Sequence, residues 1–283
     1  MIKSIFVDEG FFSALGFRYL GPIDGNNLAA VENMLRQAKQ LDEPVVIHCA
    51  TKKGYGYNRA ERRPEAFHGT PPFLVETGEV SGGSRQANGE VAMHTLIDLA
   101  RQDERIVAVT AAMPLGTCTH LFEQAFPSRH FDVGIAEQNM ASIAAGLSSY
   151  GFVPFITSFA CFASRRICDQ VAISCAYAKQ NVKIVGTDPG ITAELNGGTH
   201  MAVEDIGVLR SIPGIAIFEP SDEIELVKAM PQIIERPGPV YIRLHRKEVK
   251  ALHGEDYNFQ LGKADVLRPG KDVTLFALSL IHI

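Results

Sequence analysis

The chain has 283 residues, of which 46% are hydrophobic and 21% charged, with a formal net charge of -5 at pH 7. These values are typical of a globular protein with one large or two ordinary domains. The lysines and arginines are scattered, so no basic field exists for nucleic acid and we expect no such partner. No apolar run approaches the roughly 20 residues of a membrane helix, and Asp8 and Glu9 interrupt any signal peptide. We therefore expect a cytoplasmic protein with no membrane partner.

The first elements form one αβ unit. Apolar spacing predicts a helix over 28–41, and a short apolar run predicts a buried strand over 44–49. Asn26 or Asn27 stands where a helix cap is needed. One such unit cannot close a sheet by itself, so we expect it to belong to a larger domain.

Two irregular segments follow this unit. Residues 51–72 are rich in glycine, proline, tyrosine and charge without periodicity, which predicts an ordered loop over a site or an interface. Residues 75–89, with Gly82, Gly83 and Ser84 at the centre, have the composition of a linker.

A second and longer αβ series follows the linker. Its alternation of helical and strand patterns predicts a complete α/β domain with a doubly wound, mainly parallel sheet. Ser221 is expected to cap its last helix. The helices are predicted over 90–101, from the motif at 131–139 to Tyr150, over 165–179 and over 221–235, and the strands over 105–110, 153–159, 182–187, 214–218 and 239–244.

Within this series, the motif Phe131–Asn139 places one carboxylate, Glu137, between an apolar strand and a helix rich in alanine and glycine. A glutamate in the first turn of a helix often does no more than interact with the helix dipole. A carboxylate at a strand-to-helix turn is also a candidate for proton transfer to a bound ligand. Taken alone, the motif favours the helix-dipole interpretation.

Three cysteines, Cys161, Cys168 and Cys175, recur every seven residues. Metal binding or redox chemistry is one interpretation of this spacing. No CxxC pair or neighbouring histidine provides the usual ligand spacing, and free cysteine is one of the most buried residue types. We expect core packing and assign no metal to them.

The end of the chain predicts a further, incomplete domain. A polar connector occupies 253–260, and 272–278 has the pattern of a first strand with no elements after it. We therefore expect this sequence to be part of a longer protein.

Several motifs in the same order resemble the thiamine diphosphate enzymes related to transketolase, and within them the 1-deoxy-D-xylulose-5-phosphate synthases. The resemblance covers nearly the whole chain. Its motifs are Gly21-Pro22-Ile23-Asp24-Gly25, Thr51-Lys52-Lys53-Gly54-Tyr55-Gly56-Tyr57, Phe67-His68-Gly69, Thr110-Ala111-Ala112-Met113 and the motif around Glu137.

The resemblance implies a domain organisation. Residues 1–74 would be the end of the diphosphate-binding domain, and 75–89 a linker. Residues 90–250 would form the pyrimidine-binding domain. Residues 251–283 would hold a connector and the start of a truncated third domain.

The resemblance also implies site residues. Glu137 would hydrogen-bond N1′ of the aminopyrimidine of thiamine diphosphate and take part in its activation. Tyr57 would contact the cofactor, and His68 would face the substrate. Phe162, or less well Phe159, would stack on the aminopyrimidine, as a flat apolar ring can. Plain core packing is the alternative for both phenylalanines, and an ordinary ordered loop is the alternative for Tyr57 and His68.

Substrate-binding residues are expected near the end of this domain. The segment Asn196–His200 resembles a family segment that offers a histidine, here His200, to the substrate. Asn196 stands where the family has an acidic residue, so acceptor selectivity is expected to differ. Arg246, and with less support Arg243, would bind a phosphate, because a guanidinium can grip phosphate with two hydrogen bonds. A surface salt bridge is the alternative for each arginine.

The magnesium motif of the family, Gly-Asp-Gly followed by an asparagine pair, is absent from this sequence. We expect a homodimer or a partner chain that carries the diphosphate-binding half, and we expect thiamine diphosphate and magnesium to be held firmly only where a second chain supplies that half. The chain alone is expected to be inactive.

The favoured function is the condensation of pyruvate with glyceraldehyde 3-phosphate, in isoprenoid precursor and thiamine biosynthesis. From about Tyr150 onward, the sequence more closely resembles the C-terminal subunits of split transketolases. Such a subunit is the first alternative. A non-catalytic partner subunit is the second. A Rossmann-type nucleotide binder ranks last, because no GxGxxG follows a strand.

Overall fold

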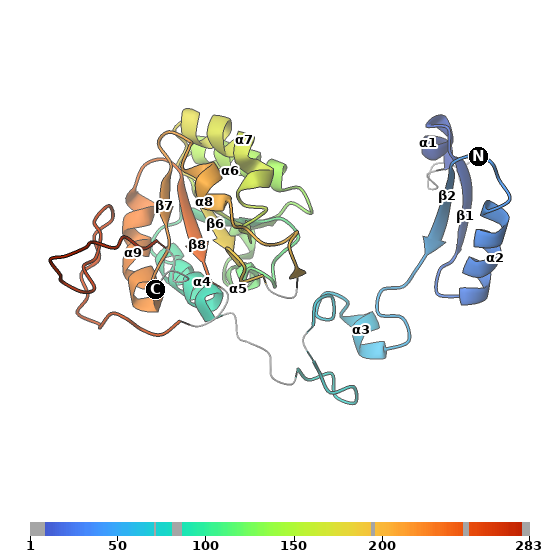
Figure 1. The fold of residues 1–283 in the computed structure, drawn as a ribbon, viewed down its shortest axis with the longest axis horizontal. Helices are drawn as coiled ribbons and strands as arrows, with labels where there is room; N and C mark the ends of the chain where they lie inside the picture. The colour runs from blue at the N-terminus through green and yellow to red at the C-terminus, as the bar shows by residue number, and fades with distance from the viewer. Residues whose placement is uncertain (1–8, 71, 81–86, 194–195, 246–248, 279–283) are drawn as a thin grey trace. The chain divides into compact units, whose positions relative to one another are not determined.

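The computed structural model describes residues 9–70, 72–80, 87–193, 196–245 and 249–278 (Figure 1). The chain divides into two compact units, Met1–Gly83 and Ser84–Ile283, called here the N-terminal unit and the C-terminal unit. Gly82, Gly83 and Ser84, at the centre of the expected linker, lie outside the described residues. Arg246 also lies outside them.

The N-terminal unit contains a two-stranded parallel sheet, β1 paired with β2. The predicted cap of α2 is confirmed at Asn27, whose side-chain oxygen accepts a hydrogen bond from the Ala30 amide at 3.2 Å. No residue of α2 is buried. The elements are α1 (Glu9–Ala14), β1 (Arg18–Asp24), α2 (Leu28–Ala38), β2 (Val45–Ala50) and α3 (Asn58–Arg62).

The C-terminal unit is built on a six-stranded sheet in the order β4-β3-β5-β6-β8-β7, and every neighbouring pair in it is parallel. Strands β3, β5, β6 and β8 are buried along their whole length, which explains why they are the apolar runs of the sequence. The strands are β3 (Ile106–Thr110), β4 (His130–Asp132), β5 (Val153–Phe159), β6 (Lys183–Thr187), β7 (Ala216–Phe218) and β8 (Val240–Leu244).

Helices cover both faces of this sheet, each with its own apolar core. One core joins α4, α5 and α9 to the sheet, and the other joins α6, η4 and α8. The predicted α/β class with a doubly wound, mainly parallel sheet is confirmed. The helices are α4 (Ala87–Ala100), α5 (Thr119–Ala125), η2 (Pro127–Arg129), α6 (Glu137–Ser149), η3 (Arg165–Ile167), α7 (Cys168–Gln170), η4 (Val171–Tyr177), α8 (Asp205–Leu209) and α9 (Glu223–Glu235).

The segment predicted as one helix over 165–179 is divided. It begins as the 3-10 turn η3, continues as α7 and widens into the π-helix η4. Cys161 and Cys175 are buried and Cys168 is partly buried, all as free thiols. Burial raises the pKa of the Cys175 thiol to about 12, as expected of a cysteine that packs in a core.

The cap of α9 differs from the prediction by one residue. Asp222, not Ser221, is the N-cap, because its carboxylate accepts from the Glu225 amide at 2.8 Å. Ser221 instead donates its hydroxyl to the Glu225 carboxylate at 2.6 Å. The two residues are adjacent just before the first turn, so the sequence pattern located the helix start but not the capping side chain.

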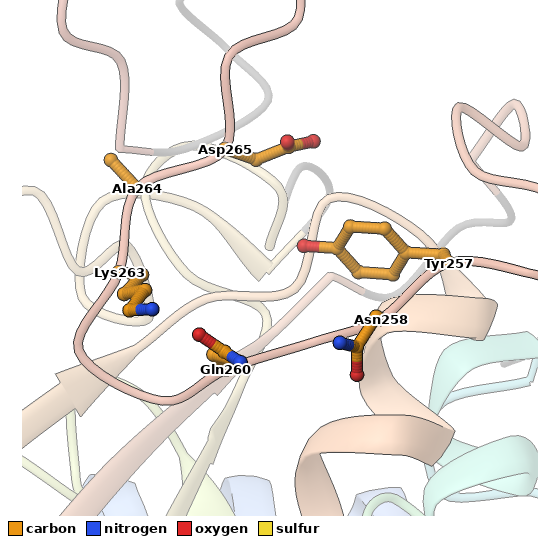
Figure 2. A pocket seen from close by; sticks show the side chains of 6 residues that line it. All are labelled: Tyr257, Asn258, Gln260, Lys263, Ala264 and Asp265. Atoms are coloured by element: carbon orange, nitrogen blue, oxygen red, sulfur yellow. The ribbon is translucent and has the colours of Figure 1, made fainter.

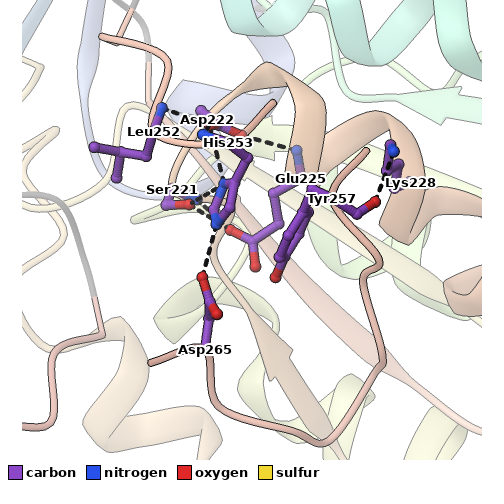
Figure 3. Close-up of polar contacts among 8 residues, drawn as sticks. All are labelled: Ser221, Asp222, Glu225, Lys228, Leu252, His253, Tyr257 and Asp265. Atoms are coloured by element: carbon purple, nitrogen blue, oxygen red, sulfur yellow. Dashed lines mark hydrogen bonds and ion pairs between the residues drawn. The ribbon is translucent and has the colours of Figure 1, made fainter. Parts of the chain in front are cut away.

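The connector after β8 packs on α9. Phe259 is buried against the core, and the Gln232 side chain donates to its carbonyl at 2.8 Å. Figure 3 shows His253 between Asp222 and Asp265, with its ring nitrogens 3.0 Å and 2.9 Å from their carboxylates. The connector therefore belongs to the C-terminal unit.

The strand predicted over 272–278 is wrong, because the structure describes this segment without regular secondary structure. Val273, Leu275 and Phe276 are 73%, 86% and 87% exposed. A strand needs a neighbour for its backbone hydrogen bonds, and the described residues offer none here.

Candidate active site

Glu137 is the first residue of α6 and is only 3% exposed. The turn that leads to it is fixed by Asp132, whose carboxylate accepts from the Gly134 amide at 3.0 Å and the Ala112 amide at 2.8 Å. Gly134 has φ +73°, a value that glycine adopts without strain. The end of β3 and the start of α6 are thereby held together, which places the carboxylate at the carboxyl edge of the sheet, where open α/β sheets bind ligands.

The partner of Glu137 is Arg166, which the sequence reasoning did not single out. Its Nη1 atom donates to Glu137 Oε1 at 2.5 Å. Its guanidinium carbon also lies 3.9 Å from the centre of the Phe162 ring, a cation–π contact. The spacing of four residues between Phe162 and Arg166 was the available signal, since it brings two side chains to one side of a helical turn.

The aromatic side chains expected at the site gather at the end of β5. The ring centres of Phe159 and Phe162 are 6.2 Å apart, and those of Phe162 and His200 are 5.4 Å apart. Through Arg166, these rings are linked to Glu137. The structure thus brings together four of the predicted residues: a carboxylate, two phenylalanines and a histidine.

The loop that carries His200 is anchored by Arg165. Its guanidinium donates to the Thr199 carbonyl at 3.1 Å and to the Glu204 carboxylate at 2.6 Å. The Thr199 hydroxyl lies 2.9 Å from His200 Nδ1. Asn196, in the same loop, is exposed.

Two predicted residues lie in the N-terminal unit, which is described by itself. The Tyr57 hydroxyl donates to the Val75 carbonyl at 2.8 Å, and its ring contacts Phe67 and Phe73. His68 is exposed. Both residues belong to the predicted ordered loop, and their roles stay predictions.

Arg243, expected to bind phosphate, lies in a buried ion-pair network. Its guanidinium is bonded to Asp205 at 2.8 Å and to Glu219 at 2.9 Å, and its side chain is 7% exposed. Although burial opposes a charge here, these carboxylates raise the pKa of Arg243 above its usual range. Since two protein carboxylates occupy the guanidinium, we leave Arg243 out of the candidate site.

The same network includes Tyr241 and His245. Tyr241 donates its hydroxyl to Asp205 at 2.8 Å, and His245 Nε2 lies 2.7 Å from Glu219. Burial alone would raise the pKa of Glu219, but the hydrogen bond from His245 and the charge of Arg243 lower it overall. These groups satisfy one another, as buried charges must.

A small pocket of about 130 Å³ lies on the connector (Figure 2). It is smaller than the roughly 300 Å³ at which ligand pockets begin. No residue of the candidate site lines it; the lining is Tyr257, Asn258, Gln260, Lys263, Ala264 and Asp265.

The described part of the chain lacks two kinds of feature. It holds no group of three histidine, cysteine or acidic side chains arranged for a metal ion. It also holds no helix with the length and apolar character to cross a membrane. The candidate site therefore offers a carboxylate and flat rings, which fit the pyrimidine ring of a cofactor, but no metal ligands.

Comparisons with known proteins define the class. The family model of the transketolase pyrimidine-binding domain matches residues 85–251, and the chain belongs to this family of thiamine diphosphate enzymes. The 1-deoxy-D-xylulose-5-phosphate synthase model matches residues 1–51. The suspected resemblance to this superfamily is thereby confirmed, and the family implies thiamine diphosphate as cofactor.

Individual relatives agree with this family. A 1-deoxy-D-xylulose-5-phosphate synthase of Caldanaerobacter subterraneus is 41% identical over 98% of this chain and 44% of its own length. A 6-deoxy-6-sulfo-D-fructose transketolase subunit of a Clostridium species is 51% identical over 66% of this chain and 58% of its own length. The chain thus spans about half the length of the curated relatives it matches.

Solved structures show the same fold. A split-gene transketolase, described as an inactive β4 tetramer, is 37% identical with a TM-score of 0.59 over 68% of this chain and 61% of its own. A transketolase of Campylobacter jejuni, 20% identical with a TM-score of 0.56 over 89% of this chain and 50% of its own, supports the fold alone.

Proposed function

We propose that this chain forms the pyrimidine-binding side of a thiamine diphosphate-dependent two-carbon transferase, with Glu137 as its catalytic carboxylate. The observation that carries the proposal is a glutamate, 3% exposed, that Arg166 links to two stacked phenylalanine rings at the carboxyl edge of a parallel sheet. The cofactor, when bound, supplies the carbon nucleophile. Glu137 holds the proton at N1′ of its aminopyrimidine, and Phe162 or Phe159 offers the flat apolar face on which that ring stacks.

The remaining site residues act on substrates in this proposal. His200 is in contact with both phenylalanine rings and would face the reacting group. Tyr57 would contact the cofactor, His68 would face the substrate, and Asn196 would contact the acceptor. Arg246 would bind the acceptor phosphate.

The preferred reaction is the condensation of pyruvate with glyceraldehyde 3-phosphate to 1-deoxy-D-xylulose 5-phosphate, with release of carbon dioxide. The synthase relatives, about 40% identical along nearly the whole chain, support this choice. A split-transketolase subunit is the second candidate, which the 51% identity to a transketolase subunit favours. Pyruvate-dependent release of carbon dioxide separates them, because a transketolase uses a ketose donor and ignores pyruvate.

The proposal requires a second source of metal ligands. Magnesium and the diphosphate would be held by a chain that carries the Gly-Asp-Gly segment, or by the missing half of a longer homodimeric protein. We expect no turnover from the 283-residue chain alone. Steady product formation by the purified chain would contradict this part of the proposal.

The test is a Glu137→Gln change in the assembled enzyme with thiamine diphosphate and magnesium. Loss of the carboxylate is expected to lower kcat by at least about 100-fold, the range of a lost acid–base group. The matched control is Glu123→Gln, because Glu123 lies on α5 with a side chain that is 55% exposed. Full activity of Glu137→Gln would exclude the proposed role.

A further inference from the structure

Arg166 makes two contacts with the candidate site at once. One is the hydrogen-bonded ion pair with Glu137, and the other is the cation–π contact with the face of Phe162. A guanidinium is planar and can satisfy both, since its edge donates hydrogen bonds while its face stacks on a ring.

These are the same two contacts that the proposed function gives to the cofactor's aminopyrimidine. In that proposal the ring, which is also flat, would also hydrogen-bond the Glu137 carboxylate and stack on Phe162. Two flat groups cannot occupy one place. We propose, resting on the proposed function, that Arg166 is a placeholder that fills the aminopyrimidine position in the ligand-free chain and withdraws when the cofactor binds.

The physical reason for a placeholder lies in the burial of Glu137. A carboxylate that is 3% exposed needs a hydrogen-bonding or charged partner, because an unpaired buried charge is strongly unfavourable. Among the described residues, the side-chain partner of this carboxylate is Arg166, whose Nη1 lies 2.5 Å from Oε1. The aminopyrimidine would replace that partner when it arrives, so the carboxylate is paired in both states.

Arg166 is also able to leave. Its side chain is 37% exposed, so a path to solvent is open, and both of its contacts are to the site itself. The neighbouring Arg165 behaves differently, because it is bonded to Glu204 and to the Thr199 carbonyl and so anchors the His200 loop. Of two adjacent arginines, one is a loop anchor and the other occupies the site.

The placeholder lowers the affinity for a pyrimidine ligand, since each binding event must break the contacts of Arg166. Removing the guanidinium should therefore tighten binding. A fixed positioning role would give the opposite sign, because loss of Arg166 would then disorder Glu137 and weaken binding. The direction of the change separates the two roles.

The experiment measures the Kd of thiamine, which carries the aminopyrimidine without the diphosphate, for the 283-residue chain by saturation-transfer NMR. Arg166→Met is expected to tighten binding by about fivefold to tenfold, the scale of a lost competing contact. Arg166→Gln, which is neutral and keeps a hydrogen-bond donor, should lie between Met and wild type. Arg165→Met is the matched control for loss of one positive charge and should not tighten binding.

Circular dichroism and thermal unfolding establish that each variant is folded, and Arg166→Gln serves as the test if Arg166→Met is not. An unchanged or weaker Kd in the folded Arg166 variant overturns the placeholder. Glu137→Gln tests the proposed function separately. If it abolishes thiamine binding while Arg166→Met fails to tighten it, the function stands and the placeholder falls. If thiamine binds and neither Glu137→Gln nor Arg166→Met changes its Kd, both fall.

Discussion

The two units of the chain differ in how much of their sequence is buried. In the described part of the N-terminal unit, only Tyr19 and Ala60 are buried, and the sheet has two strands. In the C-terminal unit, four strands are buried along their full length between two helical layers. The C-terminal unit therefore has the core of an independent domain, whereas the N-terminal unit presents apolar side chains, such as Leu28 at 81% exposure, that a larger domain would cover.

The largest effect that tests this contrast is expected from a cavity in the C-terminal core. Phe155 is fully buried on β5, so Phe155→Ala should lower the free energy of unfolding by about 3–5 kcal/mol. Leu35, on α2, is 54% exposed, and Leu35→Ala should change it by less than about 0.5 kcal/mol. Urea unfolding of the whole chain, followed by circular dichroism, measures both. Equal losses would mean that α2 has a buried face.

The same contrast explains what the sequence could predict. Strands β5, β6 and β8 are continuous apolar runs because both of their faces are covered, so they were predicted within one or two residues. Strand β1, Arg18–Asp24, was missed because it contains a glycine and a proline, and both are depleted in strands. Because β1 is only partly buried in its two-stranded sheet, its sequence shows little of the apolar pattern that predicts a strand.

In the candidate site, the local sequence pattern identified Glu137 but not the residues that surround it. The strand-to-helix turn is a local feature, and the motif placed the carboxylate at the start of α6. Arg166 lies 29 residues from Glu137, and Asp205 lies 38 from Arg243. Such pairs are made by the order of strands in the sheet, which a single sequence does not reveal, so Arg166 was missed and Arg243 was expected to be available for phosphate.

A smaller effect is expected from the buried charged network around Arg243. Asp205→Ala removes a buried partner of Arg243 and should cost about 3 kcal/mol, because part of a buried charge is left uncompensated. In the N-terminal unit, Glu43→Ala breaks an ion pair with Arg18 whose side chains are 40% and 57% exposed, and should cost less than about 1 kcal/mol. Thermal and urea unfolding compare the two. A loss under 1 kcal/mol for Asp205→Ala would contradict the importance of the network.

The smallest effect concerns the connector, which joins the C-terminal unit through charge as well as apolar contact (Figure 3). Burial of the His253 ring opposes its charge, but Asp265, Asp222 and the nearby Glu225 raise its pKa above the usual value. A raised pKa in the folded state gives stability that is complete below the unfolded value of about 6.5 and is lost as the pH rises through the folded value. Wild type should therefore exceed His253→Gln by at most about 1 kcal/mol at pH 5.5, and the difference should shrink toward pH 8.5. Unfolding of both proteins across this range measures it, and a difference that grows with pH would show that the connector is held by its apolar contacts and backbone hydrogen bonds instead.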